Sequence, residues 1–222
     1  MALLDPGDEI VLPDPHFVAY PHLARLIGAR PVLCDTYPDF RMTPERVEPL
    51  LGEHTKAVLA NSPSNPAGVV LSAEECRGLR ELCRDHGVLL ISDEIYDEFV
   101  FDDARDAERG RAPSPCQFEG AHEDTLLVRG FGKTYGVTGW RMGYAAGPPA
   151  LLAEMIKCQQ YTFVCAPSIA QWGCLAAFDA DVSETVARFQ RRRDMVVEKL
   201  SPVTDLAVPG GAFFAFVEVP ER

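Results

Sequence analysis

The chain has 222 residues, of which 47% are hydrophobic, enough for one large α/β domain or for one domain and part of a second. Its formal net charge is −12 at pH 7, whereas phosphate backbones and anionic lipid surfaces bind to basic surfaces. The sequence also lacks a long apolar run and the basic start of a signal peptide. It therefore argues against nucleic-acid and membrane partners and predicts a cytoplasmic protein.

Five short apolar runs in the first 130 residues have the length of strands. They cover residues 8–13, 29–34, 56–61, 87–92 and 124–129. Most of them lack polar alternation, which is typical of strands buried on both faces of a parallel sheet. Because helical segments fall between the runs, the sequence predicts an α/β domain with a mostly parallel sheet flanked by helices.

Two helix starts are recognisable between these runs. The letters SAEE, which begin at Ser72, form a capping box with Glu75, and Gly87 is placed to end that helix. Pro44 follows Thr43 and predicts the start of another helix.

The seven cysteines are odd in number and include no CxxC pair. This pattern argues against a zinc site and against a disulfide framework. Cys76 and Cys83 share helical spacing with neighbouring leucines, which favours packing in the core.

The second half of the chain has a different character. Residues 102–123 are charged, rich in Pro and Gly, and long for a loop in a compact domain, which predicts a mobile insertion. Residues 149–200 are mostly helical, with the arginines at 191–193 on the solvated side of their helix. Residues 210–220 are predicted to begin a strand.

Side chains suited to chemistry stand just beyond three successive strand-like runs. Asn65 follows 56–61, Asp93 and Tyr96 follow 87–92, and Lys133 follows 124–129. In a parallel α/β sheet, ligands bind outside the carboxyl ends of the strands, which share one edge. The sequence therefore predicts a site that combines an amide, a carboxylate, a phenol and an amine.

A lysine and a carboxylate at one site indicate a particular cofactor. An unperturbed lysine has a pKa of about 10.4, so it needs burial or a Schiff base with a carbonyl to act at neutral pH. Pyridoxal 5′-phosphate needs a lysine for its aldehyde and an acid facing its pyridinium nitrogen. Arg141, eight residues after Lys133, offers a fork for the phosphate.

The other lysines are weaker candidates. Lys56 precedes a predicted strand, and Lys157 and Lys199 lie on predicted helices with ordinary surface periodicity. Lys133 is therefore favoured as the functional amine.

At these residues the sequence resembles the fold-type I pyridoxal-phosphate enzymes, specifically class I/II aminotransferases of the aspartate aminotransferase kind. The resemblance covers essentially the whole chain. It rests on NSPSNPAG, SDEIYDEFVF and GKTYGVTGWRMGY, which occur in the family's order and are highly specific together. It implies pyridoxal 5′-phosphate as cofactor, amino-acid and 2-oxo-acid substrates, and a homodimer for the full-length protein.

The resemblance also implies a role for each residue. Lys133 resembles the lysine that holds the cofactor as a Schiff base and moves the proton between substrate Cα and cofactor C4′. Asp93 matches the partner of the pyridinium nitrogen. Tyr96 and Asn65 match groups that hydrogen-bond the phenolic oxygen of the ring, and Asn65 would also approach the substrate carboxylate. Arg141 matches a phosphate ligand.

One further assignment comes from the segment PDPHFVAYP, which resembles the stretch whose aromatic residue stacks on the cofactor ring. It places Phe17 in that position, although plain core packing is the alternative for Phe17. Asp93 as a cap after its strand and Asn65 as part of an Asn-Pro turn are likewise the structural alternatives. The other motifs together favour the functional roles.

The sequence departs from the family pattern in two ways. The family has serines around its lysine, one of which helps to bind phosphate, whereas this chain has Gly130 and Gly132. The chain also starts after the family's N-terminal phosphate loop and ends before the arginine that pairs with the substrate α-carboxylate. It is therefore interpreted as truncated at both ends, with residues 1–180 in the cofactor-binding large domain and 181–222 at the start of a small domain.

Three functions remain open. The favoured one is an aminotransferase that moves an amino group between an amino acid, such as aspartate, and a 2-oxo acid. A lyase of the same fold shares these motifs. A catalytically inactive remnant is supported by the truncation and by the two glycines beside Lys133.

Overall fold

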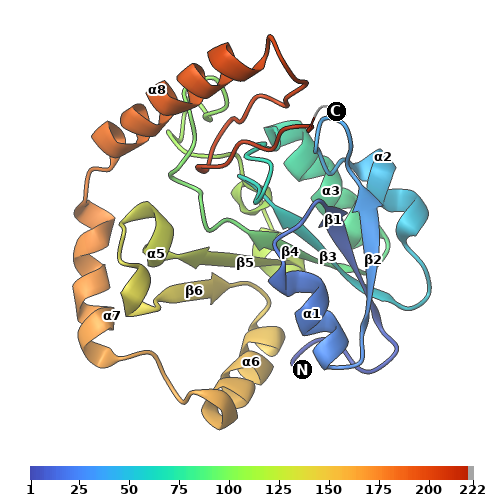
Figure 1. The fold of residues 1–222 in the computed structure, drawn as a ribbon. Helices are drawn as coiled ribbons and strands as arrows, with labels where there is room; N and C mark the ends of the chain where they lie inside the picture. Colours follow the sequence, from blue (N-terminus) through green and yellow to red (C-terminus); the bar gives the residue numbers. More distant parts are fainter. Residues whose placement is uncertain (220–222) are drawn as a thin grey trace.

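The computed structural model describes residues 1–219. Its centre is a six-stranded sheet in the order β2-β1-β3-β4-β5-β6 (Figure 1). All neighbouring strands are parallel except β5 and β6, which are antiparallel. The mostly parallel α/β fold is confirmed, and each predicted strand matches one of the first five within two residues at either end. The strands are β1 (Glu9–Asp14), β2 (Arg30–Asp35), β3 (Thr55–Asn61), β4 (Leu89–Asp93), β5 (Thr125–Gly130) and β6 (Gly143–Ala146).

Helices surround this sheet and link its strands (Figure 1). The α-helices are α1 (Ala19–Leu26), α2 (Pro44–Val47), α3 (Ala73–Asp85), α4 (Ala121–Asp124), α5 (Phe131–Thr134), α6 (Pro149–Thr162), α7 (Ser168–Leu175) and α8 (Ser183–Leu200). Short 3-10 turns are η1 (Glu48–Leu50), η2 (Pro115–Gln117), η3 (Thr138–Trp140) and η4 (Ala176–Asp179).

Both predicted helix starts are confirmed. The Ser72 hydroxyl accepts a hydrogen bond from the Glu75 backbone N–H at 3.1 Å, and the Ser72 backbone N–H donates to Glu75 Oε2 at 2.6 Å. These two bonds satisfy donors that the first turn of α3 would otherwise leave free. Gly87 follows the helix with a φ of +65°, a conformation that glycine adopts without strain. Thr43 precedes α2.

The central strands β1 and β3 are mostly buried, with apolar side chains on both faces of the sheet, as their unbroken apolar runs predict, whereas the edge strands β2 and β6 are largely exposed. Val11 and Val58 belong to one core cluster together with Leu79 of α3. Leu12 and Leu59, the next residue along each strand, belong to a second cluster, on the face covered by α1. Because successive strand residues point to opposite faces, only continuous apolar runs can fill both clusters. Cys76 and Cys83 are buried in the first cluster, which confirms their predicted packing role.

The strand predicted at residues 210–220 is wrong for the part of it that the structure describes. Residues 210–219 make only two isolated bridges, Gly211 with Val100 and Val217 with Leu206. The backbone N–H groups of Gly210 and Gly211 instead donate to the Gly68 carbonyl, at 2.9 and 3.0 Å. The segment is thus held by turn-like bonds to several loops, which leave no continuous strand partner. Residue 220 lies outside the described residues.

The predicted mobile insertion at 102–123 is wrong for its second half, which packs into the molecule, whereas none of residues 102–111 is buried. Ala112, Ser114 and Ala121 are buried. The Ala112 backbone N–H donates to the Asp97 carbonyl at 2.9 Å, which ties the segment to the loop after β4. Its polar composition therefore reflects specific hydrogen bonds.

The arginine run is solvated only in part. Arg191 and Arg192 are exposed, as expected, but the Arg193 side chain is only 10% exposed. Its Nη1 donates to the Pro209 carbonyl at 2.5 Å, and its Nη1 and Nη2 contact Asp103 at 3.1 Å. Arg193 therefore fastens α8 to both neighbouring loops.

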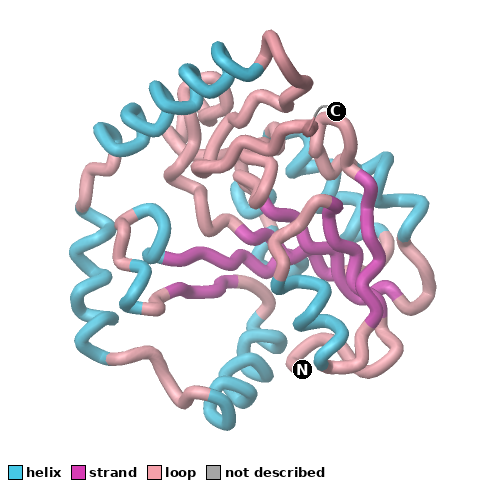
Figure 2. The backbone as a smooth tube through the Cα atoms, in the orientation of Figure 1, coloured by secondary structure: helices cyan, strands magenta, loops and turns pink. Residues whose placement is uncertain are grey.

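The last three helices run along the side of the molecule that carries β6 and α5, as Figure 2 shows together with Figure 1. Several large apolar side chains on α6 and α7 face solvent, among them Ile156, Ile169 and Trp172. Among residues 1–219, no helix is both long enough and apolar enough to cross a membrane.

Candidate active site

A cavity of about 200 Å³ lies at the carboxyl ends of β3, β4 and β5. It brings together five of the six predicted site residues and leaves out Arg141. The strand ends deliver the side chains in the order that the sequence predicts. Its lining residues are Phe17, Tyr20, Asn61, Asn65, Asp93, Ile95, Tyr96, Val128 and Lys133.

Asp93 ends β4 and is the acid of the cavity. The Tyr20 hydroxyl donates to Asp93 Oδ2 at 2.5 Å, and the Ile95 backbone N–H donates to Oδ1 at 3.2 Å. Burial raises the pKa of Asp93 despite these two bonds. Within residues 1–219, no lysine or arginine forms an ion pair with this carboxyl group. The position therefore favours a ligand that brings its own positive charge.

Tyr96 contributes a buried phenol on the loop after β4. Burial raises the pKa of Tyr96 to about 12, and the charge of Asp93 adds to this, while a hydrogen bond with the Asn65 side chain works in the opposite direction. The phenol is therefore neutral at physiological pH and can donate a hydrogen bond. Its ring packs edge-on against Phe213 and Phe214, with ring centroids 5.3 and 5.8 Å apart.

The Asn65 segment is held against β4 by Asn61. Asn61 Oδ1 accepts from the Asn65 backbone N–H at 2.7 Å, and Asn61 Nδ2 donates to the Asp93 carbonyl at 2.9 Å. The same side chain therefore positions both Asn65 and Asp93. The sequence analysis did not identify Asn61, although it ends the strand whose loop carries Asn65.

Lys133 lies on the short helix α5, directly after β5. Its Nζ is 5.7 Å from the centre of the Phe213 ring, close enough for the ring face to attract the ammonium charge. A β-carbon at Gly130 would stand 2.5 Å from Cδ1 of Ile95, whereas at Gly132 the nearest atom would be 3.5 Å away. A side chain at Gly130 would have to displace the end of the Ile95 side chain and would lie 3.3 Å from the Met142 carbonyl oxygen, while the space at Gly132 admits a side chain.

Phe17 and Tyr20 approach the cavity from the start of α1. Phe17 is 41% exposed, and its ring stands edge-on to Tyr20 with centroids 5.5 Å apart. Tyr20 was missed by the sequence analysis. The sequence does indicate Tyr20, because it lies in the same segment PDPHFVAYP, three residues after Phe17. This spacing puts both rings on one side of the helix start.

Arg141 lies apart from the lining of this cavity. It follows η3 with a φ of +53°, is exposed, and donates from Nη1 to the Thr138 carbonyl at 3.1 Å. Its predicted role as a phosphate ligand stays a prediction.

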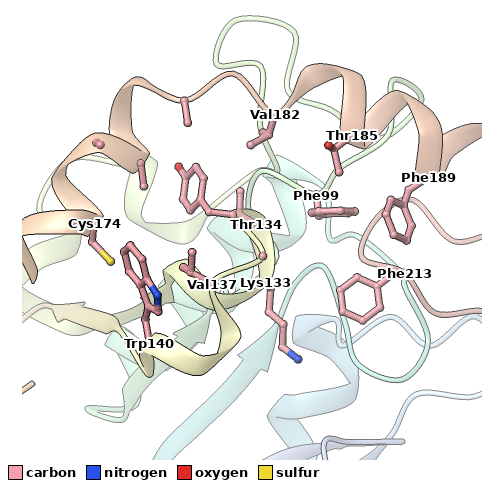
Figure 3. A pocket seen from close by; sticks show the side chains of 16 residues that line it. Phe99, Lys133, Thr134, Val137, Trp140, Cys174, Val182, Thr185, Phe189 and Phe213 are labelled. Carbon is pink, nitrogen blue, oxygen red and sulfur yellow. The ribbon is translucent and has the colours of Figure 1, made fainter. Parts of the chain in front are cut away.

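A second, larger cavity of about 560 Å³ borders α5 (Figure 3). Its labelled lining includes the aromatic side chains of Phe99, Trp140 and Phe189. The side chain of Lys133 extends away from Val182 and Thr185, on the far wall (Figure 3). Lys133 lines both cavities, which therefore adjoin at α5.

Known aminotransferases are similar to this chain in sequence and in fold. The aspartate aminotransferase of Rhizobium meliloti is 40% identical over 97% of this chain and 53% of its own length. The solved aromatic aminotransferase of Pyrococcus horikoshii superposes with a TM-score of 0.91 at 32% identity, covering 98% of this chain and 59% of that one. The aspartate aminotransferase of Thermotoga maritima gives 0.91 at 35% identity, over 99% and 58%. The chain spans little more than half the length of these relatives.

The family model for aminotransferases of class I and II matches residues 1–222. Its match extends over the whole chain, including the segments that carry Asn65, Asp93 and Lys133. The chain belongs to the class I and II aminotransferase family.

Proposed function

We propose that the protein is a pyridoxal-phosphate-dependent aminotransferase that moves an amino group between an amino acid and a 2-oxo acid. The observation that carries the proposal is the meeting of Lys133, Asp93 and Tyr96 in one cavity, with Asp93 and Tyr96 from the end of β4 and the loop after it, and Lys133 from the short helix after β5. Family membership supports it independently.

The residues present fit the cofactor. Asp93 is a buried carboxyl group without a cationic side-chain partner in residues 1–219, so a protonated ring nitrogen would supply the missing charge. Tyr96 is a neutral phenol beside Asn65, and both can donate hydrogen bonds to a ring oxygen. The exposed face of Phe17 gives a flat apolar surface for the ring.

In this proposal, bound pyridoxal phosphate supplies an electron sink that stabilises negative charge at the substrate Cα. Lys133 Nζ would hold the cofactor through its aldehyde, and as a free amine the same group would take the proton from the substrate Cα. Asp93 would keep the ring nitrogen protonated through its negative charge. Asn65 and Tyr96 would fix the ring's orientation, and Arg141 would pair with the phosphate.

The substrate assignment rests on the relatives. Several are called aspartate aminotransferases and one an aromatic aminotransferase. We infer an amino-acid donor, with aspartate as the first to test, and a 2-oxo-acid acceptor. A homodimeric, cytoplasmic protein belongs to the same proposal.

Borohydride trapping tests the cofactor site directly. The purified chain would be titrated with pyridoxal phosphate while its absorbance is recorded, then reduced and mapped by peptide mass spectrometry. We expect one adduct, on Lys133, and its loss in Lys133→Ala. Lys157→Ala is the matched control, because Lys157 is exposed on α6 and pairs only with Glu154 at 2.5 Å. Labelling spread evenly over all lysines would overturn the proposal.

Product analysis then separates the reaction types. An aminotransferase would release a 2-oxo acid and leave the cofactor in its amine form. A lyase would release ammonia and pyruvate instead. A chain that binds the cofactor but turns over none of the common amino acids would be an inactive family member.

A further inference from the structure

Arg129 links the two loops that carry the proposed cofactor residues. It lies on β5, four residues before Lys133. Its Nε and Nη2 donate to Glu94 Oε2 at 3.1 and 2.6 Å, and its Nη1 contacts Asp97 Oδ2 at 3.2 Å. Glu94 and Asp97 stand on the loop of Asp93 and Tyr96. The Arg129 guanidinium therefore connects β5, the strand before Lys133, to two residues of the loop that carries Asp93 and Tyr96.

Glu94 is fully engaged by this arrangement. Its side chain is 2% exposed, and its second oxygen, Oε1, accepts hydrogen bonds from the Ser92 hydroxyl at 2.8 Å and the Ser114 hydroxyl at 2.5 Å. Four donors thus meet one buried carboxylate. Such a carboxylate has a single low-energy position, and its backbone is fixed with it.

The side-chain link begins where the sheet bonding ends. The pairing of β4 with β5 stops at Asp93 and Val128, and the next backbone bond runs from the Glu94 N–H to the Val128 carbonyl at 2.9 Å. Beyond this point β5 pairs only with β6, with Arg129 opposite Tyr144. The Arg129 bonds therefore take over the connection that the backbone ladder no longer provides.

The negative charges of Glu94 and Asp97 keep Arg129 in its charged form, which both of its contacts need. Burial alone would lower the pKa of Arg129, but Glu94 and Asp97 outweigh it and raise the pKa above its ordinary value. Burial raises the pKa of Asp97, and the positive charges of Arg129 and Arg111 offset only part of this rise. The guanidinium stays protonated at any pH at which the protein is folded.

We propose that Arg129 is a positioning residue that sets the separation between Asp93 and Lys133 through Glu94. This inference rests on the proposed function, because it concerns residues that would face the same cofactor. A lysine at position 129 keeps the charge but cannot donate from Nε and Nη together, so it holds Glu94 through a single contact.

The first measurement compares Arg129→Lys with Arg80→Lys. Arg80 is a matched control, since it is also buried and donates from Nε and Nη2 to Asp124 at 2.7 and 3.0 Å, at the opposite end of β5. We expect Arg129→Lys to weaken pyridoxal phosphate binding by about tenfold, because side chains that are no longer held in place must be ordered when the cofactor binds. Its absorbance change on binding should also have a shifted pH midpoint. Arg80→Lys should lower the melting temperature without changing either quantity.

Hydrogen exchange of the cofactor-free chain tests the link without the cofactor. Arg129→Lys should speed exchange at residues 93–97 and 130–134 selectively, and Arg80→Lys should leave both segments unchanged. Ser114→Ala is a milder variant in case Arg129→Lys does not fold, because it leaves both Arg129 bonds to Glu94 in place and removes only the 2.5 Å bond from the Ser114 hydroxyl to Glu94 and the 3.0 Å bond that this hydroxyl accepts from the Cys116 backbone N–H. It should show the same effects in weaker form.

The outcomes are distinguishable. Unchanged local exchange together with unchanged cofactor affinity in Arg129→Lys would overturn the positioning role, as would exchange that rises evenly over the chain. If the wild-type chain forms no adduct on Lys133, the proposed function fails, while the exchange experiment still decides whether Arg129 couples the two loops.

Discussion

At Asp93, the negative charge that would favour a cationic ligand lowers the stability of the folded chain. Its carboxyl group is buried beside Tyr20 and its pKa is raised. A carboxyl group with a raised pKa in the folded chain stabilises that chain at low pH, and this contribution is lost as the pH rises through the folded value. The cofactor-free protein therefore carries an unfavourable charge at neutral pH, which a cationic ligand would relieve.

Asp93→Asn should remove the unfavourable charge and so reveal its effect on stability. The variant should melt at a higher temperature than the wild type at pH 7, and the difference should shrink as the pH falls toward 3.8, the ordinary pKa of the group. Melting temperatures of the cofactor-free chains across this range provide the measurement. The same variant should bind pyridoxal phosphate more weakly. Asp102→Asn, whose side chain is 78% exposed, is the control; an identical trend in both variants would contradict the prediction.

The two glycines before Lys133 should tolerate serine differently. A side chain fits at Gly132, where the nearest atom to a β-carbon is 3.5 Å away, and under the proposed function a hydroxyl beside Lys133 would offer the phosphate of the cofactor another donor. Gly132→Ser should therefore tighten pyridoxal phosphate binding by about tenfold without loss of stability, since hydrogen bonds to charged groups contribute about 1.5–3 kcal/mol.

Gly130→Ser is the matched contrast, because its β-carbon would meet Ile95 at 2.5 Å. Overpacking of this kind costs about 1–3 kcal/mol in unfolding free energy. Chemical denaturation of both variants should give the larger unfolding free energy for Gly132→Ser. Equal stability of the two would show that Ile95 moves aside without cost.

At the scale of elements, the start of α3 combines a cap with an ion pair. Glu75 completes the capping box and accepts from Arg41 Nε at 2.6 Å. Burial opposes its charge, but the Arg41 bonds outweigh it and hold the pKa of Glu75 below its ordinary value of 4.5. A lowered pKa gives stability that is fully present above the unfolded value and is lost as the pH falls through the folded value.

Ser72→Ala and Glu75→Gln separate these two contributions. Ser72→Ala should cost about 1 kcal/mol of unfolding free energy at any pH, because it removes only the cap. Glu75→Gln should also destabilise at pH 7, but the loss should disappear as the pH falls below 4.5. Urea denaturation at several pH values is the measurement. A pH-independent cost for Glu75→Gln would mean that the ion pair contributes nothing.

The elements that the sequence predicted best are strands that are buried on both faces. In β1 and β3 both faces are covered, so their continuous apolar runs indicate buried strands of a parallel sheet. Helix α1 was missed because Pro21 stands in it, although proline is tolerated in the first turn of a helix. Strand β6 has only four residues and no distinct pattern. The segment after Gly210 looked like a strand because Phe213 and Phe214 contribute to aromatic packing around Tyr96.

For the site, strand ends were a sufficient guide to Asn65, Asp93, Tyr96 and Lys133. Tyr20 and Arg129 could not be found that way, because their roles depend on partners that lie far away in the sequence, whereas Asn61 does end a strand and was overlooked. Glu94, for example, receives donors from the strand before it, from β5 and from Ser114. Pattern analysis sees each of these only as an isolated polar residue.

At the scale of the whole molecule, the exposed apolar side chains of α7 predict association. Ile169 and Trp172 are 83% and 75% exposed on one helix. Each such side chain gains about 1.5–3 kcal/mol when it is fully buried. The double variant Ile169→Gln/Trp172→Gln should therefore weaken self-association by more than about tenfold, as measured by sedimentation over a range of concentrations. Leu26→Gln, on α1, is the control, and equal effects from both would place the contact elsewhere.

The five predicted residues that share the cavity all come from positions 17–133. Helices α6 to α8 follow them in the chain and contribute no side chain to its lining. Substitutions on α6, α7 and α8 can therefore change the surface of the molecule and its self-association while every side chain that lines the cavity stays the same.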